Sequence, residues 1–220
     1  MKAYKTNLIL IFLLLGISPW AFSALPGMSS KHLRLVKDLM NNNLAYSQDA
    51  TTTNIIEWEE EIVDSLRQKK DYRNMFLMRQ MAVYAYSLQA KISEALKKAD
   101  AMMDEARLMK YNIGISLSYQ ALGDIYLNAG MRPEAVEEYE KAMKTLQATP
   151  HAEKIQERIF IQLVPTLIKL KRMDEAKAYL EHMSEICESK CLSPFLLYAY
   201  HAYYYLRNND LSKAREYIDE

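Results

Sequence analysis

The chemistry of Cys187 and Cys191 depends on whether the protein resides in an oxidising or a reducing compartment. They are the only two cysteines and lie four residues apart, so in an oxidising compartment they could form a disulfide that fixes the end of a helix. Two free thiols, or a redox or metal role, are the alternatives. A zinc site with His182 is not expected, because His182 and Cys187 are five residues apart and point to different sides of a helix.

The remaining reactive residue types do not form a recognisable catalytic pattern. Ser116 and Ser118 have no base at a meaningful spacing, and His201 occupies a position that predicts packing rather than ligation. The acidic run Glu59 to Glu61 could bind a cation, but such runs usually belong to a solvated helix face. We therefore predict a protein that is not an enzyme and that needs no metal and no cofactor.

Composition predicts an all-α chain. Half of the 220 residues are apolar, which is enough for a substantial core, and five glycines and six prolines leave little room for many strands or long turns. Basic and acidic side chains balance at 28 each. Nucleic acid is not an expected partner, because its binders usually carry a basic excess.

The first 23 residues have the pattern of a secretory signal peptide. Lys2 and Lys5 precede the apolar run 8–15, and Ala21 and Ser23 supply the small residues expected before a cleavage site. An uncleaved membrane anchor is the alternative, but the run is shorter than the roughly 20 residues that span a bilayer. We expect an exported, periplasmic protein.

Small and aromatic residues between 116 and 149 predict two closely packed antiparallel helices. Tyr119, Leu122, Gly123 and Tyr126 recur at i, i+3, i+4 and i+7 on one face, and a similar face follows in the second helix. That second face comprises Ala135, Tyr139 and Ala142. Gly130 and Pro133 predict the turn between the helices. Because residues 123 and 135 are small, the two helix axes can approach closely there.

The position of Ala135 repeats along the chain. Ala95, Ala135, Ala176 and Ala214 are separated by 40, 41 and 38 residues, which predicts four helix pairs. We place them at about 76–109, 116–149, 157–190 and 195–220, the last incomplete. In the fourth pair, Tyr198, Ala202 and Tyr205 are expected to pack on Ala214 and Ile218.

Two further helices are expected at about 30–43 and 54–69, giving an N-terminal pair within 24–69. Asn54 is the predicted N-cap of the second, whose buried stripe contains Ile55, Trp58, Ile62 and Leu66. Pro165 falls inside the first helix of the third pair, so either that helix is kinked or it begins near Val164.

The segment YQALGDIYLNAGMRPEAVEEYEKA, residues 119–142, resembles the tetratricopeptide repeat (TPR) family, and looser matches extend this resemblance over about 70–220. The resemblance implies a solenoid of about five helix pairs that binds proteins. The signal peptide, the units near 40 residues and an apolar end without a capping helix are also similar to the extracytoplasmic input region of bacterial TPR-containing sensors, such as hybrid two-component histidine kinases.

In the TPR family, the first helix of each pair lines a concave groove that holds a peptide or protein segment. Carried onto this sequence, the resemblance implies a groove lined by Gln80, Tyr84, Gln120, Asp124, Asn128, Arg158, Lys169, Tyr203 and Arg207. Polar residues interrupt otherwise apolar helices at most of these positions, where they could bond a peptide backbone or carboxylates.

Two functions are compatible with this pattern. The first is the sensory module of a longer signalling protein, which binds a protein segment or a neighbouring domain and acts on a C-terminal domain beyond Glu220. The second is an assembly scaffold without signalling output, whose open ends form homo-oligomers or complexes. Contact with a membrane is expected only through a downstream span.

Overall fold

The computed structural model describes residues 48–190 and 194–219, and within these ranges all regular structure is α-helical. The signal peptide, the helix expected at 30–43 and Cys191 lie outside the described residues. The described helices are α4 (Gln48–Gln68), α5 (Tyr72–Leu88), α6 (Ile92–Leu108), α7 (Asn112–Asn128), α8 (Arg132–Leu146), α9 (Glu153–Lys169), α10 (Met173–Lys190), α11 (Pro194–Arg207) and α12 (Leu211–Asp219).

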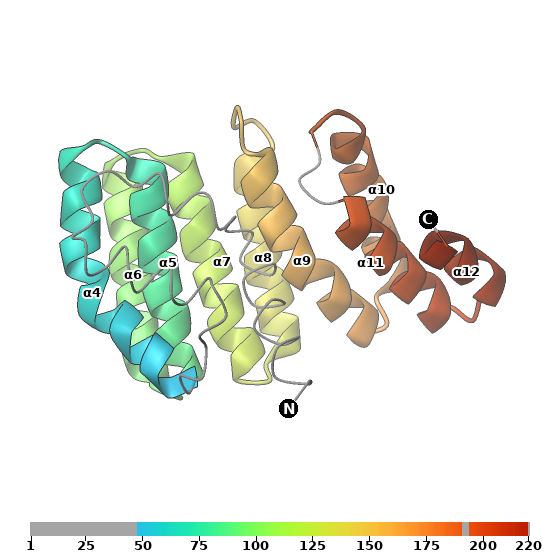
Figure 1. The fold of residues 1–220 in the computed structure, drawn as a ribbon, viewed down its shortest axis with the longest axis horizontal. Coiled ribbons are helices and arrows are strands. Elements are labelled where there is room, and N and C mark those ends of the chain that lie inside the picture. Colours follow the sequence, from blue (N-terminus) through green and yellow to red (C-terminus); the bar gives the residue numbers. More distant parts are fainter. Residues whose placement is uncertain (1–47, 191–193, 220) are drawn as a thin grey trace.

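The helices stack as antiparallel pairs along one direction (Figure 1). The pairs are α5/α6, α7/α8, α9/α10 and α11/α12, and the second helix of each of the first three pairs also packs on the first helix of the next. The first helices α5, α7, α9 and α11 contact one another in that order and form a continuous layer, called the A layer here. This arrangement confirms the predicted all-α solenoid.

Helix α4 packs on α5 as the second helix of a preceding pair would. It begins at Gln48, so the prediction that Asn54 is an N-cap is wrong. The polar residues 48–53 contain neither glycine nor proline, and each costs a helix only a few tenths of a kcal/mol relative to alanine. Nothing in this stretch therefore stops the helix from extending.

Close approach between the paired helices occurs at the predicted small residues. A Cβ atom at Gly123 would lie 2.5 Å from Cε1 of Tyr139, so the tyrosine ring occupies the space that a side chain would need. The repeated alanines are all buried, as expected: Ala95, Ala135, Ala176 and Ala214. The expectation for Ile218 is wrong, because its side chain is 63% exposed. Its neighbour Tyr217 instead packs on α11, stacked 4.5 Å from the His201 ring.

Each short turn that the structure describes contains one residue with positive φ; residues 191–193, between α10 and α11, are not described. They are Lys70, Ala90, Lys110, Gly130, His151, Lys171 and Asn209, and the first six are spaced by 20 or 21 residues. After each of these residues except His151, the next amide bonds back to the preceding helix, as from Asp71 N to Leu66 O and from Met131 N to Tyr126 O, both at 2.9 Å. Only Gly130 adopts this conformation without a Cβ penalty, which is about 1 kcal/mol for other residues. From α5 to α10, the helix lengths of 15 to 18 residues therefore repeat more regularly than the residue types in the turns.

Pro165 lies inside α9, which continues through it, so the alternative in which the helix begins near Val164 is wrong. Proline has no N–H to bond the carbonyl of Ile161. Tyr200 of α11 replaces that donor: its hydroxyl donates to Ile161 O at 3.2 Å, and its ring packs edge-on against Phe160 with centroids 5.6 Å apart. The carbonyl that Pro165 leaves without its helical donor in α9 thus helps to fix the position of α11.

We predict that Tyr200→Phe lowers the free energy of unfolding by about 1–3 kcal/mol, because it leaves the buried Ile161 carbonyl without a donor. In a Pro165→Ala background, the restored N–H can bond this carbonyl, so the same substitution should cost clearly less. Urea denaturation of the four proteins of this cycle measures the coupling. Equal costs in both backgrounds would contradict the assigned role of Tyr200.

Candidate functional site

The nine residues predicted to line the groove all lie on the A layer. Their helices are neighbours, but the side chains differ sharply in exposure. Four are buried, namely Gln80, Gln120, Asp124 and Arg158. Five are half-buried or exposed, namely Tyr84, Asn128, Lys169, Tyr203 and Arg207.

Asp124 is the centre of the buried group. Its Oδ1 accepts a hydrogen bond of 2.7 Å from the Tyr139 hydroxyl, and its Oδ2 accepts one of 3.4 Å from Gln80 Nε2. Gln80 Oε1 in turn accepts a hydrogen bond of 2.9 Å from Nη2 of Arg158. A chain of polar contacts therefore crosses from α7 to α5 and to α9. Because these side chains bond one another, they fix the spacing of three neighbouring helices.

Burial dominates the electrostatics of this chain of contacts. It raises the pKa of Asp124 to about 7, although the Tyr139 hydrogen bond, the Arg158 charge and the Gln80 hydrogen bond all act in the opposite direction. Burial also lowers the pKa of Arg158 to about 10, against the attraction of Asp124 and with a contribution from nearby Arg73. The pKa of Tyr139 is raised well above its usual value by burial and then by Asp124.

Two buried polar atoms of the A layer are unpaired within the described residues. Gln120 Oε1 and Arg158 Nε are buried and have no hydrogen-bond partner there. An unpaired buried polar atom costs about 1–3 kcal/mol. These two atoms, one acceptor and one donor, therefore carry a cost that the rest of the fold offsets.

The accessible residues lie mainly at the C-terminal ends of the A-layer helices. Asn128 ends α7, and its Nδ2 donates to Ser87 Oγ at 2.7 Å. Lys169 ends α9 and Arg207 ends α11, and both are exposed. Tyr84 and Tyr203 lie one turn before the C-terminal ends of α5 and α11, and both are half-buried. Burial raises the pKa of Tyr84 to about 12.

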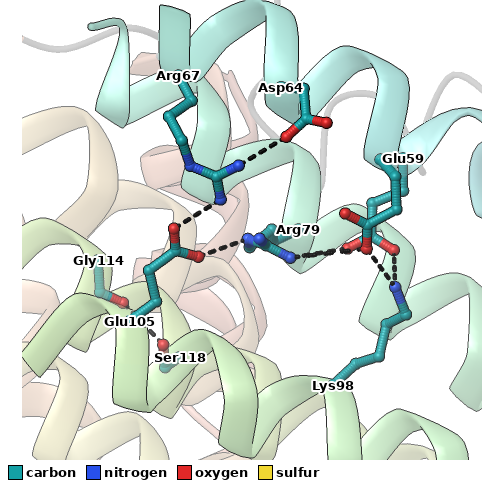
Figure 2. A network of polar contacts seen from close by, with 9 residues as sticks. Glu59, Asp64, Arg67, Arg79, Lys98, Glu105, Gly114 and Ser118 are labelled. Carbon is teal, nitrogen blue, oxygen red and sulfur yellow. Dashed lines mark hydrogen bonds and ion pairs between the residues drawn. The ribbon is translucent and has the colours of Figure 1, made fainter. Parts of the chain in front are cut away.

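The structure also contains a charged cluster that the sequence did not reveal. Glu59 was expected on a solvated face, and this expectation is wrong, because its side chain is 1% exposed. Figure 2 shows Glu59 of α4 facing Lys98 of α6 and Arg79 of α5, with Glu59 Oε1 3.5 Å from Arg79 Nη1. The missed signal is that Glu59 follows Ile55 by four residues and precedes Ile62 by three, on the buried stripe.

A second branch of the same cluster lies one to two turns away (Figure 2). Glu105 of α6 pairs with Arg67 of α4 at 2.7 Å and with Arg79 at 2.9 Å. Burial raises the pKa of Glu59, and the Lys98 contact opposes that rise. Because every charge here has a partner of opposite sign, the cluster joins α4, α5 and α6 and does not offer a vacant ligand position.

The residues considered for chemistry have structural roles where they are described. Ser116 Oγ donates to Ala142 O at 3.0 Å, and Ser118 Oγ donates to Gly114 O at 2.9 Å. His201 is buried, as expected, and its Nε2 lies 3.1 Å from Ser184 Oγ. His182 is largely exposed. Within the described ranges, no group of three or more His, Cys, Asp or Glu residues could hold a metal ion.

The disulfide proposed for Cys187 and Cys191 stays a prediction, because Cys191 lies outside the described residues. The backbone of Cys187 belongs to α10, which continues to Lys190. Among the described helices, none has the length and apolar character of a membrane span.

Comparison with known proteins agrees with the helix pairing. Residues 117–145, within α7 and α8, match the family model of the tetratricopeptide repeat. This match confirms the resemblance carried by residues 119–142. A search of curated proteins found no significant match. The resemblance to two-component sensors stays a prediction.

Asp124→Asn should reduce the pH dependence of stability. The pKa of Asp124 is about 7 in the folded protein and about 4 in the unfolded chain, so folding takes up a proton between these pH values. The free energy of unfolding therefore falls as pH rises from about 4 to about 7. Asparagine does not titrate, so the variant should lose less stability across this pH window, by roughly 1–4 kcal/mol. Urea denaturation at several pH values provides the comparison, and parallel profiles for both proteins would refute the buried ionisation.

Proposed function

We propose that this tetratricopeptide-repeat chain is a non-catalytic protein-interaction module that holds a partner segment against the A layer. The observation that carries the proposal is the repeat match at residues 117–145 within a continuous layer of first helices. In this fold, stacked repeats present an extended surface, and a few anchor residues supply most of the binding energy. The repeat itself suggests a helical scaffold of the protein-interaction type.

The exposure of the A-layer residues supports a division of roles. The buried residues Gln80, Asp124 and Arg158 hold the helices at fixed spacing through their mutual hydrogen bonds. The exposed Lys169 and Arg207, on neighbouring helices α9 and α11, are the cations that a partner's carboxylates could reach.

The remaining accessible residues suit a peptide backbone and an apolar side chain. Asn128 uses its amide nitrogen for Ser87, which leaves its side-chain oxygen for a backbone N–H of a partner. Tyr84 and Tyr203 add rigid aromatic surface. We propose that these contacts orient the bound segment along the layer.

We further propose that the module is exported to the periplasm and forms the sensory input region of a longer signalling protein. The signal-peptide pattern of residues 1–23 supports export. The sensory role rests on the resemblance of the repeat units and the leader to extracytoplasmic input regions. In this role, capture of the partner on the A layer would bias the state of an attached output domain.

Site-specific photo-crosslinking tests the binding surface. A photoreactive amino acid at position 169 or 207 should trap a discrete partner in cells that export the protein, whereas the same group at the exposed positions 97 or 177 of α6 and α10 should not. Lys169→Glu combined with Arg207→Glu should abolish a crosslink formed from position 128, because the partner's carboxylates would be repelled. Equal crosslinking from both sets of positions would contradict binding at the A layer.

A further inference from the structure

One edge of the solenoid has a row of exposed cations. It consists of the turns that join α4 to α5, α6 to α7 and α8 to α9, which lie at the upper end of the stack in Figure 1. We call this row the basic edge. Its exposed cations are Lys69, Lys70, Arg107, Lys110, Lys144 and Lys154.

Two acidic residues of the basic edge, Asp71 and Glu105, have other partners. Asp71 accepts hydrogen bonds from the backbone and side chain of Asn74, and Glu105 pairs with Arg67 and Arg79. The six exposed cations make no ion pair with any acid in the described parts of the chain. Exposed Asp104, one turn before the end of α6, offsets only part of this charge.

Helix electrostatics explain only part of the pattern. Cations in the last turn of a helix complement its dipole, which accounts for Arg107 and Lys144. Lys69, Lys70 and Lys110 lie beyond the helix ends and are not accounted for in this way.

Acids are sparse in the first turns of the helices that begin at this edge. The first turns of α5 and α7 contain no acidic residue and that of α9 contains Glu153, whereas α6, α8 and α10, which begin at the opposite edge, have Glu94, Glu134 and Asp174 with Glu175. The opposite edge therefore has more first-turn acids than the basic edge, although the charges of the whole chain balance.

The positive charge also continues inward from this edge. Arg73, in the first turn of α5, is half-buried and lies near enough to Arg158 to disfavour its charged form. Two cations close together in a partly desolvated place repel each other, and an added anion would relieve that repulsion. A further cation, Arg73, therefore lies beneath the surface at this end of the A layer.

We propose that the basic edge is a docking surface for an acidic polypeptide segment of the partner. The inference rests on the proposed protein-binding function and adds the chemistry of the partner and a second surface. A polypeptide fits better than a membrane, because Leu108 is the one strongly exposed large apolar side chain among the described residues of this edge. It also fits better than nucleic acid, because the whole chain lacks a basic excess.

Charge reversal with a matched control tests this surface. The probe is a fluorescein-labelled peptide of alternating glutamate and serine, and its fluorescence anisotropy is measured with the full chain. Lys69→Glu, Lys70→Glu and Lys110→Glu together should weaken binding by about tenfold or more. The control, Lys97→Glu, Lys177→Glu and Lys213→Glu, changes the net charge equally on other surfaces and should remain within about twofold of the parent.

A second variant covers the case in which the first folds poorly. Lys69→Gln, Arg107→Gln and Lys144→Gln leave the positive-φ residues unchanged and should still weaken binding severalfold. Binding of the parent should also fall as salt is raised.

Three results would overturn the inference. The first is equal loss in the edge variant and the control. The second is stronger binding of duplex DNA, or of vesicles containing phosphatidylglycerol, than of the peptide. The third is loss only in the Lys169→Glu, Arg207→Glu variant, which would reject the basic edge and leave the proposed A-layer function standing.

Discussion

The close contact of α7 with α8 at Gly123 is the constraint on which the rest of the structure depends. The Tyr139 ring lies where a side chain at position 123 would be, and its hydroxyl donates to Asp124 one residue further on. The absence of a side chain at Gly123 therefore has two consequences. The two helices approach closely, and a buried carboxylate gains a donor that helps to offset the cost of its burial.

From Asp124, the contact extends through Gln80 to Arg158, so one helix pair sets the positions of its neighbours on both sides. Buried polar chains of this kind add little net stability, but they favour one arrangement of the helices over slipped ones. In the third and fourth pairs, the bond from Tyr200 to the carbonyl freed by Pro165 has the same effect. The solenoid thus combines apolar packing with a few specific polar contacts that fix the positions of its helices.

Sequence periodicity could predict the helices and their small contact residues, because Gly123 and the repeated alanines leave a direct signal. It could not reveal turns in which Lys70, Ala90 or His151 adopts positive φ, since these residues do not favour that conformation. The polar residues of the A layer were identified, but position alone cannot separate Gln80 and Arg158, which bond each other, from exposed Lys169. Their partners lie far away in sequence, so only the fold reveals the contact.

The most direct test of this account is the free energy of unfolding of Gly123→Ala, measured by urea denaturation. At an unconstrained helix position, replacing glycine with alanine stabilises a protein by up to about 1 kcal/mol. Here the added methyl group would meet the Tyr139 ring, so we expect a loss of about 1–3 kcal/mol, with much of it recovered when Tyr139→Leu is added. A stabilised Gly123→Ala protein would contradict the close contact from which the account begins.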